Sequence, residues 1–210
     1  MRTHFLNHFF LLFICLACTS IGLAQKQEHS LTDSLLRELP KEKDDTNKIN
    51  LLLHIAGSYK QNGNKSIKYA QEALELAERI VWEKGIGKAY ISLGEGNIKK
   101  ENNQTALEQL QKGLKIAEIL DDRYLKYSAL KNIGSVYYQL HDYTKALDYF
   151  LLSLKITETL GNQQEVYNNM LSIGNLYSYK IHDYSKALDY YLRCLKISEE
   201  ICDTRSEERR

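Results

Sequence analysis

Proline is nearly absent from this chain: Pro40 is the only one among 210 residues. Because proline is the strongest helix breaker, its scarcity, together with many Leu, Lys, Glu and Ala residues, favours a mostly helical fold. The chain also lacks an excess of charge of one sign, since 28 basic and 27 acidic side chains give a formal net charge of +1. A charge so close to zero argues against nucleic acid or an anionic lipid surface as the partner.

Cysteine is scarce as well, and its placement argues against a metal centre. Cys15 and Cys18 fall in an apolar N-terminal segment, which leaves Cys194 and Cys202 outside it. These two belong to no C-x-x-C or Cys/His metal-binding spacing. Eight residues of helix separate them by about 12 Å, beyond disulfide reach unless the helix frays before Cys202. We therefore expect no metal and no other cofactor.

The first 24 residues show the pattern of a secretory signal peptide. Arg2 precedes an apolar stretch over 9–17, and Gly22 and Ala24 supply the small residues before a cleavage point. The stretch is shorter than the roughly 20 residues that a membrane span needs. We therefore expect cleavage after Ala24, an exported protein that is periplasmic or secreted, and no membrane span in the mature chain. An uncleaved N-terminal membrane anchor is the alternative.

Beyond this segment the sequence repeats itself with a period of about forty residues. Two stretches nine residues long, HDYTKALDY at 141–149 and HDYSKALDY at 182–190, are almost identical. Small residues recur at the same spacing, and the last spacing of the alanines is one residue longer, with the extra residue expected between Tyr177 and His182. These repeat slots are Gly94, Gly134 and Gly174 in one series and Ala106, Ala146 and Ala187 in the other.

Each copy predicts a pair of amphipathic helices. In the third copy, apolar residues recur at mostly three- and four-residue steps over 130–140 and again over 143–156. A lone helix of this length is marginal in water, so the pairs must stack to bury their apolar faces. We expect the glycine and alanine slots where helices cross closely, with Leu110, Phe150 and Tyr191 filling the space one turn later.

The pattern divides the chain into a leader, a cap, a repeat domain and a tail. Residues 1–24 form the predicted signal peptide. Residues 25–46 are predicted to form a short capping helix, which stops near Pro40, and a linker. The repeat domain is predicted over 47–201, with copies at 47–84, 85–122, 125–162 and 165–201. Residues 202–210 form a polar tail.

The duplicated His-Asp-Tyr triplet raises the question of catalysis. A catalytic site would need a water-excluding pocket and a defined partner for the histidine. The triplet instead falls in the turn between the two helices of a copy, and the first two copies have no histidine at this place. We interpret Tyr143 and Tyr184 as packing residues, His141 and His182 as solvated turn residues, and the chain as a protein without enzymatic activity.

The repeats resemble the tetratricopeptide repeat family. The resemblance rests on the Ile-Gly-x-x-Tyr spacing in IGSVY and IGNLY and on the runs DYTKALDYF and DYSKALDYY. The period near forty is similar to the long variant found in bacterial sensor proteins and kinesin light chains. The resemblance implies an all-α fold, a right-handed α-α superhelix of about four helix-turn-helix repeats. The sequence departs from the pattern at Asn97, where the family has a tyrosine.

The resemblance also implies a concave groove lined by the first helix of each repeat, and a protein or peptide as its partner. A plain solvated face is the alternative. Mapped by repeat position, the groove side carries Leu53 and Lys60 in the first copy, Lys88, Ile91, Glu95 and Lys99 in the second, Lys131, Ser135 and Tyr138 in the third, and Asn168, Leu171 and Asn175 in the fourth. One subtype of the family holds the C-terminal carboxylate of a peptide with Lys and Asn side chains at fixed repeat positions. This sequence has other residues where that clamp would begin, so we expect no carboxylate clamp.

The last predicted helix is apolar on a face that no later repeat covers. Its apolar residues are Tyr184, Leu188, Tyr191, Leu192, Leu195 and Ile197. We expect self-association through the last repeat, a partner bound there, or a longer parent chain. Two functions follow: an exported scaffold for protein or peptide binding, or the sensory input module of a bacterial signalling protein of the histidine kinase, cyclase or transcription-regulator type.

Overall fold

The computed structural model describes residues 32–207, with side chains as far as Cys202. The predicted signal peptide, its cleavage point and residues 25–31 of the predicted cap lie outside the described residues. Within them the chain is entirely helical, and the predicted all-α repeat array is confirmed. A helix at 32–38 comes first, and the elements that follow are the 3-10 helix η1 (Leu39–Lys41), α2 (Thr46–Ser58), α3 (Gly63–Arg79), α4 (Glu83–Lys99), α5 (Asn103–Ile119), α6 (Arg123–Gln139), α7 (Tyr143–Leu160), α8 (Gln163–Leu176), the π-helix η2 (Tyr177–Ile181) and α9 (Tyr184–Glu207).

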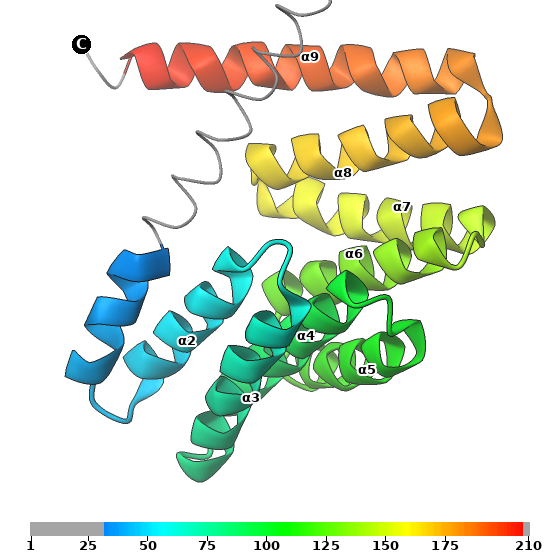
Figure 1. The fold of residues 1–210 in the computed structure, drawn as a ribbon. Coiled ribbons are helices and arrows are strands. Elements are labelled where there is room, and N and C mark those ends of the chain that lie inside the picture. Colours follow the sequence, from blue (N-terminus) through cyan, green and yellow to red (C-terminus); the bar gives the residue numbers. More distant parts are fainter. Residues whose placement is uncertain (1–31, 208–210) are drawn as a thin grey trace, which may run out of the picture.

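The helices form four antiparallel pairs that stack one on the next (Figure 1). The pairs are α2 with α3, α4 with α5, α6 with α7, and α8 with α9, and each begins one or two residues before the start expected from the sequence. The helix α9 continues to Glu207 and takes in most of the segment that the sequence predicted as a tail. No helix among residues 32–207 combines the length and the apolar character of a membrane span.

Side chains at the helix starts explain where the helices begin. The carboxylate of Asp45 accepts hydrogen bonds from the backbone N–H groups of Asn47 and Lys48, and Asp142 accepts one from Lys145. Asp122 caps α6 in the same way. Burial opposes the ionisation of Asp122, but the Lys84 ammonium 2.7 Å away and the backbone donors outweigh it and hold the pKa of this carboxyl below its usual value.

Left-handed residues end the helices and turn the chain back. Within the described part of the chain, six residues have positive φ, and only Gly161 among them is a glycine. The two histidines of the repeated triplet, His141 and His182, lie at two of these positions with φ of 61° and 60°. This conformation costs a residue with a Cβ atom roughly 1–2 kcal/mol, so stacking of the pairs must stabilise these short turns.

Close helix crossings occur at the glycine slots of the repeat. A methyl group added to Gly94 would lie 2.5 Å from Cγ of Leu110, and one added to Gly134 would lie 2.9 Å from Cδ1 of Phe150. Gly174 faces the ring of Tyr191 in the same way. The alanine slots Ala106, Ala146 and Ala187 are all buried. In each of the last three repeats, a large residue of the second helix therefore packs against a glycine on the first.

The two ends of the array are built differently. At the first end, the segment 32–41 packs on α2: Thr32 Oγ1 donates to Ser58 Oγ over 3.0 Å, and Leu39 contacts the first core cluster. At the last end, η2 takes up the extra residue of the fourth repeat before α9 begins. Nothing among the described residues covers the outer face of α9.

Candidate functional site

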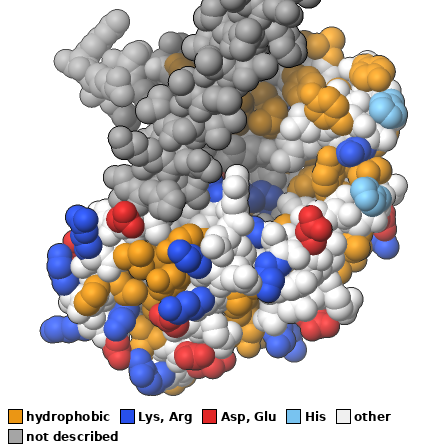
Figure 2. All heavy atoms as spheres, viewed as in Figure 1, with side chains coloured by type: hydrophobic (Ala, Val, Ile, Leu, Met, Phe, Trp, Pro, Cys, Tyr) orange, Lys and Arg blue, Asp and Glu red, His pale blue; other side chains and the backbone are white. Residues whose placement is uncertain are grey.

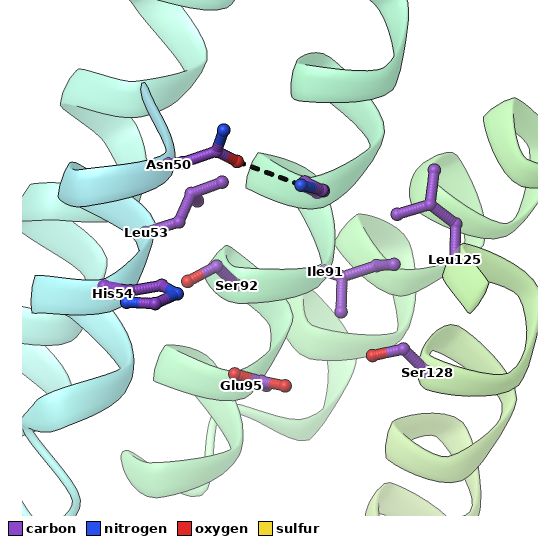
Figure 3. A pocket seen from close by; sticks show the side chains of 9 residues that line it. Asn50, Leu53, His54, Ile91, Ser92, Glu95, Leu125 and Ser128 are labelled. Carbon is purple, nitrogen blue, oxygen red and sulfur yellow. Dashed lines mark hydrogen bonds between the residues drawn. The ribbon is translucent and has the colours of Figure 1, made fainter. Parts of the chain in front are cut away.

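An open depression of about 280 Å³ lies between the first helices of the first three repeats, α2, α4 and α6 (Figure 3). These helices face the same side of the array because every second helix of the chain returns to that side. The lining residues are Asn50, Leu53, His54, Lys88, Ile91, Ser92, Glu95, Leu125 and Ser128. Four of them, Leu53, Lys88, Ile91 and Glu95, are among the groove residues expected from the sequence.

Lys88 supplies the positive charge of the depression. Its ammonium donates a hydrogen bond to Asn50 Oδ1 over 2.9 Å, which links α4 to α2, and it lies 5.5 Å from the centre of the Trp82 ring. Burial lowers the pKa of Lys88, and the neighbouring Lys84 ammonium lowers it further. The nearby carboxylate of Asp122 already pairs with Lys84. Lys88 is therefore a half-buried cation that an anionic group of a ligand could stabilise.

Glu95 supplies a negative charge two helical turns further along α4. Its carboxylate accepts a hydrogen bond from Asn132 Nδ2 over 3.0 Å, which links α4 to α6, while the same amide also donates to the carbonyl of Ser128. Seven residues of helix place Glu95 roughly 10 Å from Lys88 along the axis. The depression therefore has a cationic end and an anionic end, each held by an asparagine of a neighbouring helix.

Apolar side chains form the floor between the charged ends. Ile91 is buried to 4% exposure and Leu125 to 5%, and Leu53 is half-buried beside them. In Figure 3 the imidazole of His54 points from α2 toward Ser92 on α4. An apolar floor with a few polar groups at its margins is the usual composition of a ligand site.

A third polar link continues the same surface toward the fourth repeat. Lys131 on α6 donates to Glu165 at the start of α8 over 3.3 Å. Nearby, burial raises the pKa of the Tyr127 hydroxyl to about 12, and the Glu165 carboxylate adds to the effect. Asn50–Lys88, Glu95–Asn132 and Lys131–Glu165 thus place one polar pair at each junction between first helices.

The structure does not bring the other expected groove residues into the depression. Lys99 donates to the Tyr59 carbonyl and to Ser66 Oγ, and Asn175 Oδ1 accepts from the Tyr191 hydroxyl, so both tie helices together. Ser135 donates a hydrogen bond to a carbonyl of its own helix, and Leu171 packs into the last core cluster. Lys60 is exposed in the turn after α2, Tyr138 is exposed near the end of α6, and Asn168 is half-buried on α8.

Sequence reasoning missed six residues of the site. One is Asn132, which donates to Glu95, and the other five line the depression: Asn50, His54, Ser92, Leu125 and Ser128. Three of the six directly follow a residue that was predicted: His54 follows Leu53, Ser92 follows Ile91 and Asn132 follows Lys131. Rotating each first helix by one residue would have found these three, and the repeat spacing alone does not fix that rotation.

The two His-Asp-Tyr triplets lie at the turns before α7 and α9, where both histidines are exposed. His141 Nδ1 lies 2.7 Å from the Tyr143 hydroxyl, and the matching distance from His182 to Tyr184 is 3.5 Å. The Lys180 ammonium lies 5.6 Å from the ring centres of both Tyr138 and Tyr143. Within residues 32–207, no group of three His, Cys, Asp or Glu side chains is placed to hold a metal ion.

Comparison with known families gives one match. Residues 126–200 match the family model described as tetratricopeptide repeat. This segment runs from α6 to α9 and contains both copies of the duplicated stretch. No curated protein sequence is significantly similar to the chain.

Solved structures share the fold along most of the chain. A Rap protein in complex with Competence and Sporulation Factor aligns with a TM-score of 0.75 and 24% identity, over 85% of this chain and 51% of that one. A STAND signal-transduction ATPase with a tetratricopeptide repeat sensor, from Pyrococcus horikoshii, aligns with a TM-score of 0.63 and 21% identity, over 89% of this chain and 29% of its own. Kinesin light chain repeats from Podospora anserina align with a TM-score of 0.58 and 9% identity, over 86% and 91%. The chain thus spans about half the length of the Rap protein.

Proposed function

We propose, from the premise that this chain is a tetratricopeptide repeat protein, that it is a scaffold which binds a peptide or an extended protein segment between α2, α4 and α6. Repeats of this family generally serve as binding scaffolds and not as catalysts. The observation that carries the proposal is the depression with Lys88 at one end, Glu95 at the other and an apolar floor between them.

The dimensions of the depression suit an extended peptide. An extended chain advances about 3.3 Å per residue, so the roughly 10 Å between Lys88 and Glu95 corresponds to three residues. A segment with an acidic side chain near Lys88, apolar residues over Ile91 and Leu125, and a hydrogen-bond donor near Glu95 would match each part. The Rap protein, which has the same fold, was solved with a bound factor, and this supports binding as the use of such an array.

The test is selection of peptides from a displayed library of random hexapeptides, followed by affinity measurements on the Lys88→Ala and Glu95→Ala variants. We expect each variant to weaken binding of the selected peptides by about tenfold or more, because each removes a partner from the site. Lys115→Ala is the matched control, since Lys115 is an exposed lysine on α5. Failure to select any peptide, or equal binding by the wild type and the Lys88 variant, would refute the proposal.

We also propose that the scaffold is exported. The support is the order of Arg2, the apolar stretch 9–17 and the small residues before Gln25. Expression in a bacterial host followed by mass spectrometry of the mature protein tests this. An N-terminus at Gln25 is expected, and an intact Met1 terminus in the membrane fraction would favour the anchored alternative.

A sensory input module is the second candidate function. It is favoured by the likeness to the repeat sensor of the STAND ATPase, of which this chain covers 29%. Sequencing the coding region downstream of codon 210 separates the two candidates. An in-frame kinase, cyclase or transcription-regulator region would support the sensory module and count against a stand-alone scaffold.

A further inference from the structure

The outer face of α9 is a continuous apolar stripe. Tyr184, Leu188, Leu192 and Leu195 are 66%, 58%, 57% and 55% exposed. Their spacing of four, four and three residues places them on one side of the helix. In Figure 2 hydrophobic side chains gather over the end of the array that α8 and α9 form. A stripe of this kind on an outer helix marks an interaction surface.

Two positions of the stripe are used for packing where another helix follows, whereas Leu151, at the position of Leu192, is 37% exposed. One repeat earlier, Leu154 occupies the position of Leu195 and is buried to 5% exposure beside Val166 and Met170 of α8. Leu147 occupies the position of Leu188 and is half-buried in the same cluster. Leu188 and Leu195 therefore stand at positions that pack against a following helix elsewhere in the array.

We propose that this face packs antiparallel against α9 of a second copy, about a two-fold axis at Leu192. In that register Leu192 meets Leu192 of the second copy, and Leu188 meets Leu195. Asp189 and Lys196 are exposed, lie two turns apart on one flank of the stripe and would pair across the interface. A single two-fold axis is consistent with all of these pairs. The midpoint between Leu188 and Leu195 and the midpoint between Asp189 and Lys196 each lie within half a residue of Leu192.

The character of the surface favours a second copy over an unrelated partner. Opposite charges on one flank make the face complementary to itself, which a two-fold interface requires. The four side chains of the stripe offer an area on the order of 400 Å², about half of the roughly 800 Å² that each partner of a standard interface buries. Head-to-tail stacking is blocked because segment 32–41 already packs on α2.

The first experiment measures the mass of the purified full chain by light scattering at about 50 μM. We expect twice the chain mass of 24.4 kDa, and we expect Leu192→Glu to raise the dimer dissociation constant at least about 100-fold. Leu152→Glu is the matched control, since Leu152 is a 51% exposed leucine on α7. A monomeric wild type, or equal effects of the two substitutions, would overturn the proposal.

The second experiment tests the register by exchanging the charges. Asp189→Lys and Lys196→Asp each place like charges in contact and should weaken the dimer about tenfold, and the double exchange should restore it to within about threefold. A double variant as weak as the single variants would overturn the register. In a Cys202→Ser background, Leu192→Cys should form an intermolecular disulfide on mild oxidation whereas Leu152→Cys should not. Circular dichroism confirms that each variant is folded.

Discussion

At the scale of single residues, the glycine slots decide how closely the helices of a repeat approach. Gly94 leaves no room for a methyl group because Leu110 is fully buried beside it and cannot move aside. We expect Gly94→Ala to lower the free energy of unfolding by about 1–3 kcal/mol, as overpacking of a core does. Denaturation by urea, followed by circular dichroism, measures the change.

Gly57 is the control for this substitution. It lies in α2 with no other atom within 4 Å of the place where a Cβ would stand. Gly57→Ala should therefore raise the free energy of unfolding by up to about 1 kcal/mol, because alanine loses less conformational entropy in a helix. Equal effects of the two substitutions would show that the crossing at Gly94 is not tight.

The small residues could be predicted from the sequence, and most of the site could not. Glycine recurs every forty residues because the crossing helix leaves no space for a side chain, and this spacing can be read directly from the sequence. The groove depends instead on the rotation of each first helix, and a change of one position exchanges Ile91 for Ser92 or Lys131 for Asn132. Polar residues that bond to a neighbouring helix, such as Asn50 and Asn132, show no periodic signal at all.

At the scale of helices, one junction between repeats differs from the others. Ala77 with Ala89, and Ala117 with Ala129, are fully buried residues at equivalent positions of the first two junctions. Thr157 and Asn169 replace them between α7 and α8, where Asn169 Nδ2 donates to Thr157 Oγ1 over 3.3 Å. Both side chains are fully buried, and Asn169 Oδ1 has no hydrogen-bond partner among the described residues.

A double-mutant cycle tests this junction. Thr157→Val alone should lower the free energy of unfolding by about 1–3 kcal/mol, because it leaves the buried Asn169 amide without its partner. The double variant Thr157→Val/Asn169→Leu should lose less than the single variant, since no buried polar group then lacks a partner. Additive losses in urea denaturation would contradict a direct coupling between the two side chains.

The element boundaries were mostly accessible to sequence reasoning. Aspartates before apolar runs predict where helices begin, as Asp45 and Asp142 do. The extra residue of the fourth repeat was expected between Tyr177 and His182, and η2 occupies 177–181. Its conversion into a π-helix could not be predicted, because a loop of one more residue would satisfy the same spacing.

At the scale of the whole molecule, each repeat contacts only its neighbours, so stability should vary along the array. Leu110 is fully buried in a cluster that joins α4, α5 and α6, whereas Tyr191 is half-buried on Gly174 at the last pair. Leu110→Ala should cost about 2–5 kcal/mol and destabilise repeats on both sides of it. Tyr191→Ala should destabilise only the last helix pair, α8 with α9.

Hydrogen exchange with mass spectrometry distinguishes these outcomes. Leu110→Ala should speed exchange throughout α4, α5 and α6, and Tyr191→Ala should speed it in α8 and α9 while α2 to α5 keep their protection. If Tyr191→Ala speeded exchange equally in every helix, the array would unfold as one unit and not repeat by repeat. Raising the protein concentration should slow exchange in α9, because the proposed dimer buries the stripe at Leu188, Leu192 and Leu195. Dimerisation would then stabilise the weakest repeat of each copy against that of the other.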